Sequence, residues 1–465
     1  MSELPEGWER LKLGDLIELK YGKSLPAKQR NGSGYPVYGS NGVVGLHSEP
    51  LVVGGGLIVG RKGSFGEVHL CEDNFSPIDT TYFVDSFPSG TMKYWYYQLK
   101  VLPLTKLNRS TAIPGLNRDD AYAQGVLLPP EAEQKRIVEK LDEVLAQVDT
   151  IKARLDGIPD LLKRFRQSVL ASAVSGRLTE EWRGGGEHDL IDFNEIASMN
   201  FEQRKLSIDG RIQKAKPLEQ VPTLKLPKSW SWCSIDDCAL KITDGTHHSP
   251  DSFPEGDFMY VTSKNVREGF IDLSNITYVT KETHKDIYSR CDVKLGDVLY
   301  VKDGANTGLS CVNNIAEQIS LLSSVGVIKV TSYMDAKYLQ HYLNSPIGRK
   351  LMLDKMGGTA IKRLTLKKIK ESPVSVPPIE EQQEIVRLVD QYFAFADTIE
   401  AQVKKAQARV DNLTQSILAK AFRGELVPQD PNDEPADKLL ERIAQARIEA
   451  EALAKAAKKA GKKKA

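Results

Sequence analysis

An internal duplication constrains this chain more than any other feature of its sequence. The segment Pro129-Pro-Glu-Ala-Glu-Gln134 returns further along the chain as Pro377-Pro-Ile-Glu-Glu-Gln382, and identities continue at the same offset as far as Leu178 and Leu426. A repeat of this length fixes the architecture before any helix or strand is assigned. Two equivalent halves are therefore expected.

Both copies of the repeat have the apolar spacing of an amphipathic helix, with steps of three and four residues. The apolar positions are Ile137, Leu141, Leu145, Val148, Ile151 and Leu155 in the first copy, and Ile385, Val389, Phe393, Ala396, Ile399 and Val403 in the second. Gly157-Ile158-Pro159 predicts a break in the first helix, because proline lacks an amide hydrogen and disfavours helical geometry before it. The second copy predicts one helix of about 40 residues from near Glu380 to Phe422.

A shorter repeat opens each half, where Leu4-Pro-Glu-Gly-Trp8 returns as Leu226-Pro-Lys-Ser-Trp230. The regions that follow differ in sequence and length, apart from Thr111-Ala-Ile113, which recurs as Thr359-Ala-Ile361. Both are rich in glycine, tyrosine, threonine and β-branched residues, which favours strands. The predicted divisions are a first strand-rich domain (1–128), a central helical region (129–183), a connector (184–225), a second strand-rich domain (226–376), a second helical region (377–427) and a helical, basic tail (428–465).

These patterns predict an α+β fold with two mixed, strand-rich domains separated by duplicated long helices. The helices are expected to pair as an antiparallel coiled coil, which gives the chain pseudo-twofold symmetry.

Composition limits the function classes. The chain has 63 Lys and Arg against 62 Asp and Glu; an autonomous DNA-binding protein usually carries a basic excess, so any DNA contact is expected to be shared with partners. The five cysteines are scattered and lack zinc-like spacing, so free thiols are expected. No apolar run is long enough to span a bilayer, and residues 1–8 lack the character of a signal peptide, so a cytoplasmic location is expected.

Catalytic motifs are missing from the sequence. Gly22-Lys23-Ser24 imitates the end of a phosphate-binding loop, but Ile17 stands where the first glycine belongs, and the segment 55–62 has Arg61 in place of the lysine. No methyltransferase motif, cofactor-binding glycine motif or nuclease carboxylate cluster is found. The chain is therefore expected to have no catalytic activity and no bound cofactor of its own.

The alternation of variable and repeated regions, together with the Pro-Pro-x-x-Glu-Gln and Leu-Pro-x-x-Trp segments, resembles the specificity subunit of type I restriction-modification enzymes across nearly the whole chain. Residues 161–170 and 413–426 are most similar to the enterobacterial type IA branch. The resemblance implies that each variable domain reads one half of a bipartite double-stranded DNA site, while the helices set the spacer between the halves.

The resemblance also implies partners. Two methyltransferase subunits would dock on the helices, and restriction subunits would complete an adenine-N6 methyltransferase and ATP-dependent endonuclease. S-adenosylmethionine, ATP and Mg would then be bound by those subunits. Two alternatives stay open: an autonomous DNA methyltransferase or nuclease with fused reading domains, against which the missing motifs argue, and a coiled-coil scaffold, which does not explain two dissimilar domains.

In the first domain the candidate DNA contacts lie in Gly-bounded loops. Lysines beside a glycine and an aromatic residue can approach phosphates, and arginine can pair bidentately with guanine for about 1–3 kcal/mol of discrimination. The alternative for the loops is a solvated surface turn, and for the last two residues a structural link between domain and helix. The candidates are Lys20, Tyr21, Lys23, Ser24, Arg61, Lys62, Ser64, Asn117 and Arg118.

In the second domain the segment Thr243–His248 stands at the position of the first loop. Its paired histidines suggest a metal, but no further ligands have suitable spacing, so a polar loop that faces DNA is favoured and no metal is predicted. The candidate DNA contacts here are Thr243, Thr246, His247, His248, Lys264, Asn265, Lys302, Asn306, Lys362 and Arg363. Partner binding is predicted for Ile137, Leu141, Leu145, Ile385, Val389 and Phe393, where the alternative is packing of the helices against each other.

Overall fold

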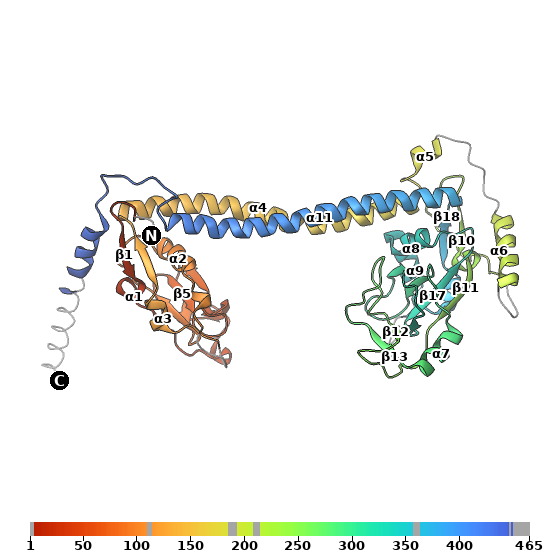
Figure 1. Cartoon of the computed structure of the whole chain (residues 1–465), viewed down its shortest axis with the longest axis horizontal. Coiled ribbons are helices and arrows are strands. Elements are labelled where there is room, and N and C mark those ends of the chain that lie inside the picture. Colours follow the sequence, from red (N-terminus) through yellow and green to blue (C-terminus); the bar gives the residue numbers. More distant parts are fainter. Residues whose placement is uncertain are drawn as a thin grey trace. The chain divides into compact units, whose positions relative to one another are not determined.

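The computed structural model describes residues 4–108, 114–184, 193–207, 214–356, 363–445 and 448–449. It divides into two compact units, the first formed by residues 1–156 and 404–465 and the second by residues 157–403. Each unit combines a strand-rich domain with part of two long helices, α4 (Glu131–Val174) and α11 (Ile379–Ala421) (Figure 1). The segments 111–113 and 359–361, Lys362 and the end of the basic tail lie outside the described residues.

The first unit contains three small sheets. Their strand orders are β1-β9, β2-β8-β5-β6 and β4-β3-β7, and only the β3–β7 pair is parallel. The elements are β1 (Glu9–Lys12), α1 (Leu13–Leu16), β2 (Lys20–Tyr21), η1 (Ala27–Gln29), β3 (Tyr35–Gly39), β4 (Gly42–His47), β5 (Gly56–Gly60), β6 (Val68–Cys71), β7 (Ser76–Pro77), β8 (Thr81–Val84), α2 (Met92–Val101), η2 (Leu104–Lys106), α3 (Arg118–Tyr122) and β9 (Gly125–Leu128).

The second unit repeats this topology. Its sheets have the orders β10-β18, β11-β17-β14-β15 and β13-β12-β16, and here only β12–β16 is parallel. Its elements are α5 (Glu180–Gly184), α6 (Phe193–Ser207), β10 (Ser231–Ser234), η3 (Ile235–Cys238), β11 (Ala239–Asp244), β12 (Phe258–Val261), β13 (Thr277–Val279), α7 (Lys281–Arg290), β14 (Val298–Val301), β15 (Ser310–Val312), β16 (Ser320–Leu321), β17 (Val325–Val330), α8 (Ala336–Asn344), α9 (Pro346–Leu353), α10 (Leu366–Lys370) and β18 (Pro373–Val376).

A central strand buried on both faces organises each domain. In β5, Leu57 and Val59 join the core that includes α2, whereas Ile58 joins a second cluster around Phe75. In β14, Val298 and Tyr300 face the core that includes α8, and Leu299 and Val301 face the opposite side. Side chains alternate along a strand, so an unbroken apolar run is what a strand covered on both faces requires. The predicted α+β fold with two equivalent, strand-rich domains is confirmed.

The helix α4 runs for 44 residues without a break, so the break predicted at Gly157-Ile158-Pro159 is wrong. Pro159 and Gly157 are both exposed. On an exposed face, water can satisfy the carbonyl group that proline leaves unbonded, while the packed turns on either side hold the helix. The second helix, α11, runs for 43 residues as predicted.

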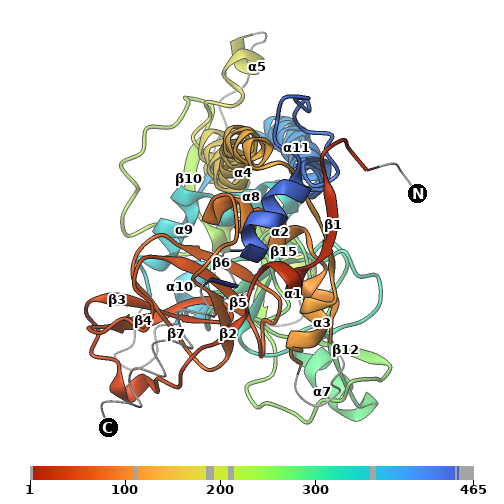
Figure 2. The same cartoon turned by 90° about the vertical axis from the view of Figure 1, so that its left-hand side faces the viewer.

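The two helices pack antiparallel within each unit, as the ion pairs show. In the first unit Lys152 Nζ lies 2.9 Å from Asp411 Oδ1, and further along α4 Asp156 accepts a 2.7 Å hydrogen bond from Gln407. In the second unit Arg166 lies 2.6 Å from Asp397. Figure 2 shows α4 and α11 side by side with α2 against the pair. Exposed ion pairs stabilise little; the buried apolar stripes of both helices supply the packing energy.

The two short repeats meet in the structure. Trp8 donates its indole hydrogen to Glu133 at 2.9 Å, and Trp230 donates to Glu381 at 2.9 Å. The neighbouring glutamine then donates to the carbonyl of the first proline of the segment in both copies, at 3.0 Å from Gln134 and 2.9 Å from Gln382. Each strand-rich domain is thereby tied to the beginning of a long helix by the same buried contacts.

The end of the other long helix is tied to the same place. Gly176 follows α4 and Gly424 follows α11, both at positive φ, as is common after a helix. A Cβ on Gly424 would collide with Pro5, and one on Gly176 would collide with Pro227. The opening segment of each half therefore packs where one helix begins and the other ends.

Segments outside the repeats also dock on their units. Residues 436–445 are helical, with Ala436 and Leu439 buried and Ala436 donating its backbone N–H to the carbonyl of Gly7 at 2.9 Å. In the predicted connector, α6 packs on the second unit, where Arg204 donates to the carbonyl of Ala239 at 2.6 Å.

All five cysteines are buried and free, as expected. Among the described residues, no helix has the length and apolar character needed to cross a membrane.

Replacing Glu381 by alanine is expected to cost more stability than replacing Glu133. Glu381 is fully buried and paired with Arg183, and loss of one partner of a buried ion pair costs about 3–5 kcal/mol. Glu133 accepts hydrogen bonds from the neutral side chains of Trp8 and Gln429. Loss of the acceptor of such buried hydrogen bonds costs about 1–3 kcal/mol of stability. Hydrogen exchange of peptides around Trp8 and Trp230 measures each unit separately. Equal loss of protection would contradict this ranking.

Substitution of the exposed helix breakers should strengthen the middle of α4. Gly157→Ala is expected to add about 1 kcal/mol, because no atom lies within 4 Å of the new Cβ, and Pro159→Ala up to about 3 kcal/mol. Hydrogen exchange of residues 150–165 is the measurement. Both variants should slow the exchange. Lys163→Ala, on the same helix, is a control that should leave the exchange rates nearly unchanged. Slower exchange in this control, or unchanged exchange in the other two variants, would argue against the explanation.

Candidate nucleic-acid interface

Loops at equivalent places in the two domains carry the predicted site residues. After β2, Gly22 and Lys23 donate to the carbonyls of Thr81 and Pro77 at 3.1 and 3.0 Å. After β11, Gly245 and Thr246 donate to the carbonyls of Val325 and Leu321 at 3.4 and 2.9 Å. A Cβ on either glycine would overlap a backbone carbonyl, so only glycine allows the loop to pass this close. The predicted correspondence of the two loops is confirmed.

A second pair of loops follows the central strands. Arg61 donates its backbone N–H to Thr80 at 2.9 Å and accepts one from Leu116 at 2.9 Å. Lys302 repeats this arrangement with Ser324 at 3.0 Å and Leu364 at 2.9 Å. In each domain the structure therefore brings three segments together. They are the loop after β2 or β11, the loop after the central strand β5 or β14, and the segment before α3 or α10.

In the first domain these loops build an aromatic and cationic cluster. The Tyr21 ring is half exposed and lies 5.1 Å from the ring of Tyr82. The guanidinium carbons of Arg61 and Arg118 each lie 5.2 Å from the centre of the Tyr21 ring. Such cation–π contacts contribute about 0.5–1 kcal/mol at exposed positions. Both guanidinium groups are thereby held beside one ring.

The other predicted residues of the first domain have different surroundings. Lys20 forms a 2.7 Å ion pair with Asp85. Asn117 caps α3 by accepting the backbone N–H of Asp119 at 2.8 Å, which supports a structural role for its side chain. Four further predicted side chains are exposed and available to a ligand: Lys23, Ser24, Lys62 and Ser64.

The second domain has a buried carboxylate at the place of Tyr21. Asp244 is 2% exposed and lies 2.8 Å from Arg290, 3.2 Å from Lys302 and 3.2 Å from His247. Burial alone would raise the pKa of Asp244, but Arg290, Lys302 and His247 together lower it below its ordinary value. Lys302 and Arg290 thus share one internal counter-ion, the buried carboxylate of Asp244.

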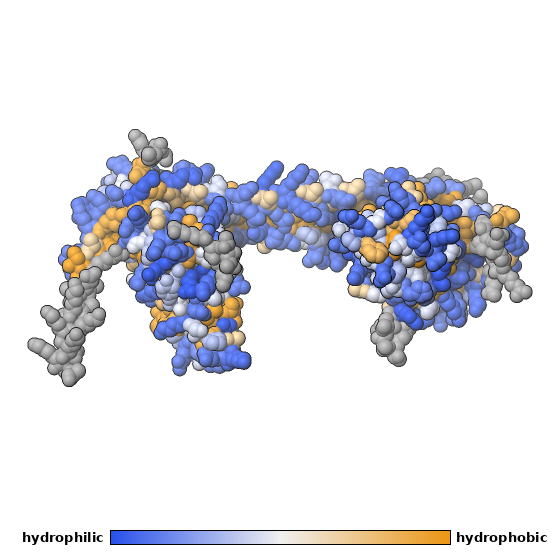
Figure 3. All heavy atoms as spheres, turned by 60° about the horizontal axis from the view of Figure 1, so that its bottom comes forward, coloured by the Kyte–Doolittle hydropathy of each residue, from blue (hydrophilic) through white to orange (hydrophobic). Residues whose placement is uncertain are grey.

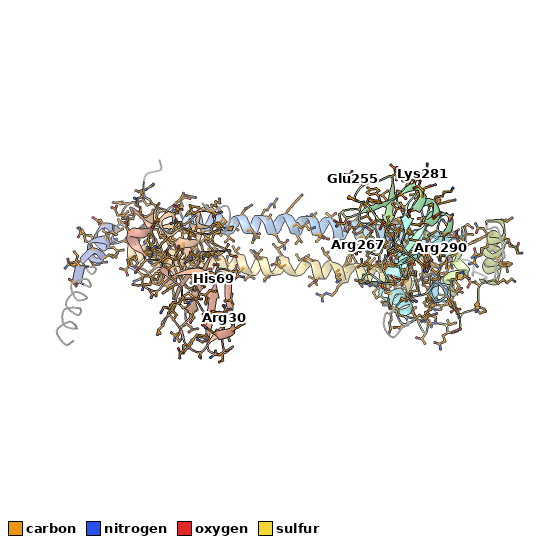
Figure 4. The ribbon with its side chains drawn as sticks, turned by 90° about the horizontal axis from the view of Figure 1, so that it is seen from below. Arg30, His69, Glu255, Arg267, Lys281 and Arg290 are labelled. Atoms are coloured by element: carbon orange, nitrogen blue, oxygen red, sulfur yellow. The ribbon has the colours of Figure 1, made fainter. Side chains whose placement is uncertain are left out.

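Arg290 was not predicted as a site residue. It ends α7, far from Asp244 in the sequence, and no motif links the two positions. Figure 4 labels Arg290 on the second unit, together with Arg267, Glu255 and Lys281, and Arg30 and His69 on the first. Arg30 is used internally, because it donates to the carbonyls of Leu25 and Val44 at 3.0 and 2.9 Å.

Two predicted DNA contacts of the second domain are corrected. Asn265 is buried, accepts the backbone N–H of Thr262 at 3.0 Å and donates to the carbonyl of Asp272 at 3.2 Å. Lys302 is buried against Asp244. Buried side chains with satisfied partners have no group left for a ligand.

The other predicted residues of this domain keep at least part of their side chain accessible, with one exception. His247, His248, Lys264 and Arg363 are exposed, and Thr243 and Asn306 are half-buried. Asn306 donates to the carbonyl of Ser263 at 2.8 Å. Thr246 is the exception, because it is buried in its loop. Among the described residues, no group of histidine, cysteine and carboxylate side chains could hold a metal ion.

The predicted partner-binding residues lie mainly in the core. Four of them, Ile137, Leu141, Ile385 and Val389, are fully buried and offer no surface to another chain, which corrects that prediction. Leu145 and Phe393 are half-buried.

Other apolar side chains on the helices are exposed, and the predicted partner residues did not include them. They are Ile151 and Leu413 in the first unit and Leu161, Tyr392 and Phe395 in the second. Figure 3 shows such apolar side chains scattered along a largely hydrophilic helix surface. Most of them stand outside the apolar stripes, and the spacing of residues alone gives no reason to select them.

The comparison with known families identifies the chain. A model described as the type I restriction modification DNA specificity domain matches residues 5–160 and 230–407. The chain belongs to this family.

Named relatives agree with the family match. The specificity subunit of the type I restriction enzyme EcoDI from Escherichia coli is 32% identical over 455 residues, which cover 95% of this chain and 96% of the relative. The EcoBI specificity subunit, also from Escherichia coli, is 34% identical and covers 83% of this chain and 78% of the relative. The resemblance drawn from the repeats is confirmed.

Solved structures show the same fold. A chain from a study of complex assembly and conformational transition in the type I restriction-modification system aligns with a TM-score of 0.57 and 17% identity over 91% of this chain and all of its own. The HsdS subunit from Thermoanaerobacter tengcongensis aligns with a TM-score of 0.50 and 18% identity over 91% of this chain and 98% of its own.

Acid should loosen the second domain through Asp244. The lowered pKa of this carboxyl group means that its contribution to stability is present at neutral pH and is lost as the pH falls below about 4. Asp244→Asn should cost about 3 kcal/mol at pH 7, because Lys302 then stays buried without its counter-ion. Hydrogen exchange of residues 239–250 between pH 3 and 7 should show a shallower pH dependence in this variant.

Asp251→Asn is a matched control in the same region, because Asp251 is exposed. This control should follow the wild-type pH profile. A wild-type profile in Asp244→Asn would show that the buried carboxylate does not govern the stability of the domain.

Proposed function

We propose that this specificity subunit directs a type I restriction-modification complex to a split DNA sequence, with each strand-rich domain reading one half. The observation that carries the proposal is the combination of one scaffold with two different loop sets. The three-sheet topology and the Trp–Glu contact recur in both units. The loops at equivalent places present Tyr21 with arginines in one unit and Asp244 with its cations in the other. Equal scaffolds with unlike loops suit an asymmetric bipartite site.

The long helices are the proposed ruler between the two halves of the site. A helix rises about 1.5 Å per residue, and a packed antiparallel pair resists bending, so the number of helical residues would set the number of base pairs in the spacer. The tether of each domain to a helix beginning and a helix end supports this role, because it prevents the readers from turning freely.

The proposed partners are two methyltransferase subunits and the restriction subunits. Docking would use the exposed side chains of the helices, such as Leu161 and Phe395, rather than the buried stripes. Adenine methylation, S-adenosylmethionine, ATP and Mg would belong to these partners. The nearly balanced charge of 63 basic and 62 acidic residues supports a division of labour in which partners supply part of the phosphate contacts.

Methylation mapping tests the proposal. The chain is co-expressed with its methyltransferase subunit, and methylated adenines are mapped across a host genome. A single split motif is expected, and exchange of residues 8–129 for another reading domain should change one half of that motif only. The matched exchange of residues 230–377 should change only the other half. A continuous motif, or no methylation, would overturn the two-reader proposal.

A further inference from the structure

We propose that Arg61 and Arg118, which both lie over the ring of Tyr21, form a paired guanidinium site that binds hydrogen-bond acceptors of duplex DNA, whereas the second domain closes the equivalent position with its own Asp244. The proposal rests on the function proposed above and assigns the two readers different electrostatic roles. At this loop position, the first domain meets DNA with cations that no internal carboxylate pairs.

The geometry of the pair is set before any ligand arrives. Both guanidinium carbons lie 5.2 Å from the Tyr21 ring centre, Arg61 also lies 6.0 Å from Tyr82, and Arg118 lies 5.7 Å from Tyr122. A guanidinium group held over an aromatic ring by its positive charge keeps N–H donors that can serve a second partner. Two guanidinium groups beside one half-exposed ring place several donors for acceptors within a small area.

The charge of the pair has no internal counter-ion among the residues that the structure describes. Neither guanidinium group forms an ion pair with a carboxylate there, and Asp85 pairs with Lys20 at 2.7 Å. The Nε atom of Arg118 is buried without a hydrogen-bond partner. Guanidinium groups recognise bidentate acceptors, and the acceptors that DNA offers are the guanine edge in the major groove and the phosphate oxygens.

The second domain shows the same scaffold with the site closed. Gly22 and Gly245 occupy equivalent turns, so Asp244 replaces Tyr21, and Arg61 corresponds to Lys302. Asp244 holds Lys302 at 3.2 Å and Arg290 at 2.8 Å. Lys302, the counterpart of Arg61, is buried and paired with this carboxylate, so it presents no free cation to DNA. Recognition in this domain is left to the exposed part of the loop, including His247 and His248.

The experiment uses the complex of the full chain with its methyltransferase subunits and a duplex that contains the mapped motif. Variants are Arg61→Ala, Arg118→Ala and the corresponding lysine substitutions, which keep the charge but lose the planar fork. Affinity is measured over a range of salt concentrations, and the methylated motif is mapped again for each variant. Arg10→Ala on β1, where the arginine is exposed, is the matched charge control.

Two results support the proposal and distinguish the two acceptors. If an arginine reads guanine, its alanine and lysine variants relax one position in a single half of the motif, and affinity for the original site falls about 5- to 150-fold. If it contacts a phosphate, the motif is unchanged, the slope of log Kd against log salt falls by about one in the alanine variant, and lysine restores the slope. Arg10→Ala should leave both readouts unchanged.

Other results overturn it. Unchanged motif and unchanged salt slope in both alanine variants would remove the guanidinium site. Thermal unfolding of each complex verifies that the variants are folded, and the lysine variants test the site even where alanine destabilises it. Failure of the function proposed above is separate, because the wild-type complex would then give no split motif.

Discussion

The buried carboxylate in each Pro-Pro-x-x-Glu-Gln segment is the contact on which the rest of the structure depends. Burial of a carboxylate is costly unless donors surround it, and here the donors come from distant segments. Glu381 accepts from Trp230 in the opening segment and from Thr179 after α4. Glu133 accepts from Trp8 and from Gln429, which follows α11. One side chain therefore joins the beginning of one helix, the end of the other and the entry to a strand-rich domain.

The residues of this junction must stay fixed, whereas the loops of the strand-rich domains can vary. Trp8 and Trp230 directly precede β1 and β10, and their contacts attach each domain to a long helix. The Gly22 and Gly245 loops follow β2 and β11, which lie in a different sheet. Substitutions in those loops leave the junction untouched, provided that the glycine at the tight turn remains. A protein family built in this way can change the sequence it reads without rebuilding its core, since loops on a rigid scaffold carry recognition.

The sequence predicted those parts of the structure that depend on period and repetition. The duplication and the apolar spacing indicated two long helices and two equivalent domains, because these signals are local or recur in register. Pro159 misled because packing on both sides of an exposed proline outweighs a local rule. The spacing could not separate Ile137, which packs in the core, from a partner-binding residue. The pairing of Asp244 with Arg290 depends on tertiary structure and has no signal in the sequence.

The net charge of this chain is a poor guide to the positive charge that its loops can offer to DNA. The near balance of 63 basic and 62 acidic residues hides an uneven distribution, because many of the carboxylates serve the protein itself. Asp397 and Asp411 pair the helices, and Asp244 pairs with Lys302 and Arg290 in its own domain. Arg61 and Arg118 instead pair with an aromatic ring, which orients a cation without cancelling its charge. At equivalent loop positions, one domain therefore places a carboxylate beside its cations and the other places a tyrosine.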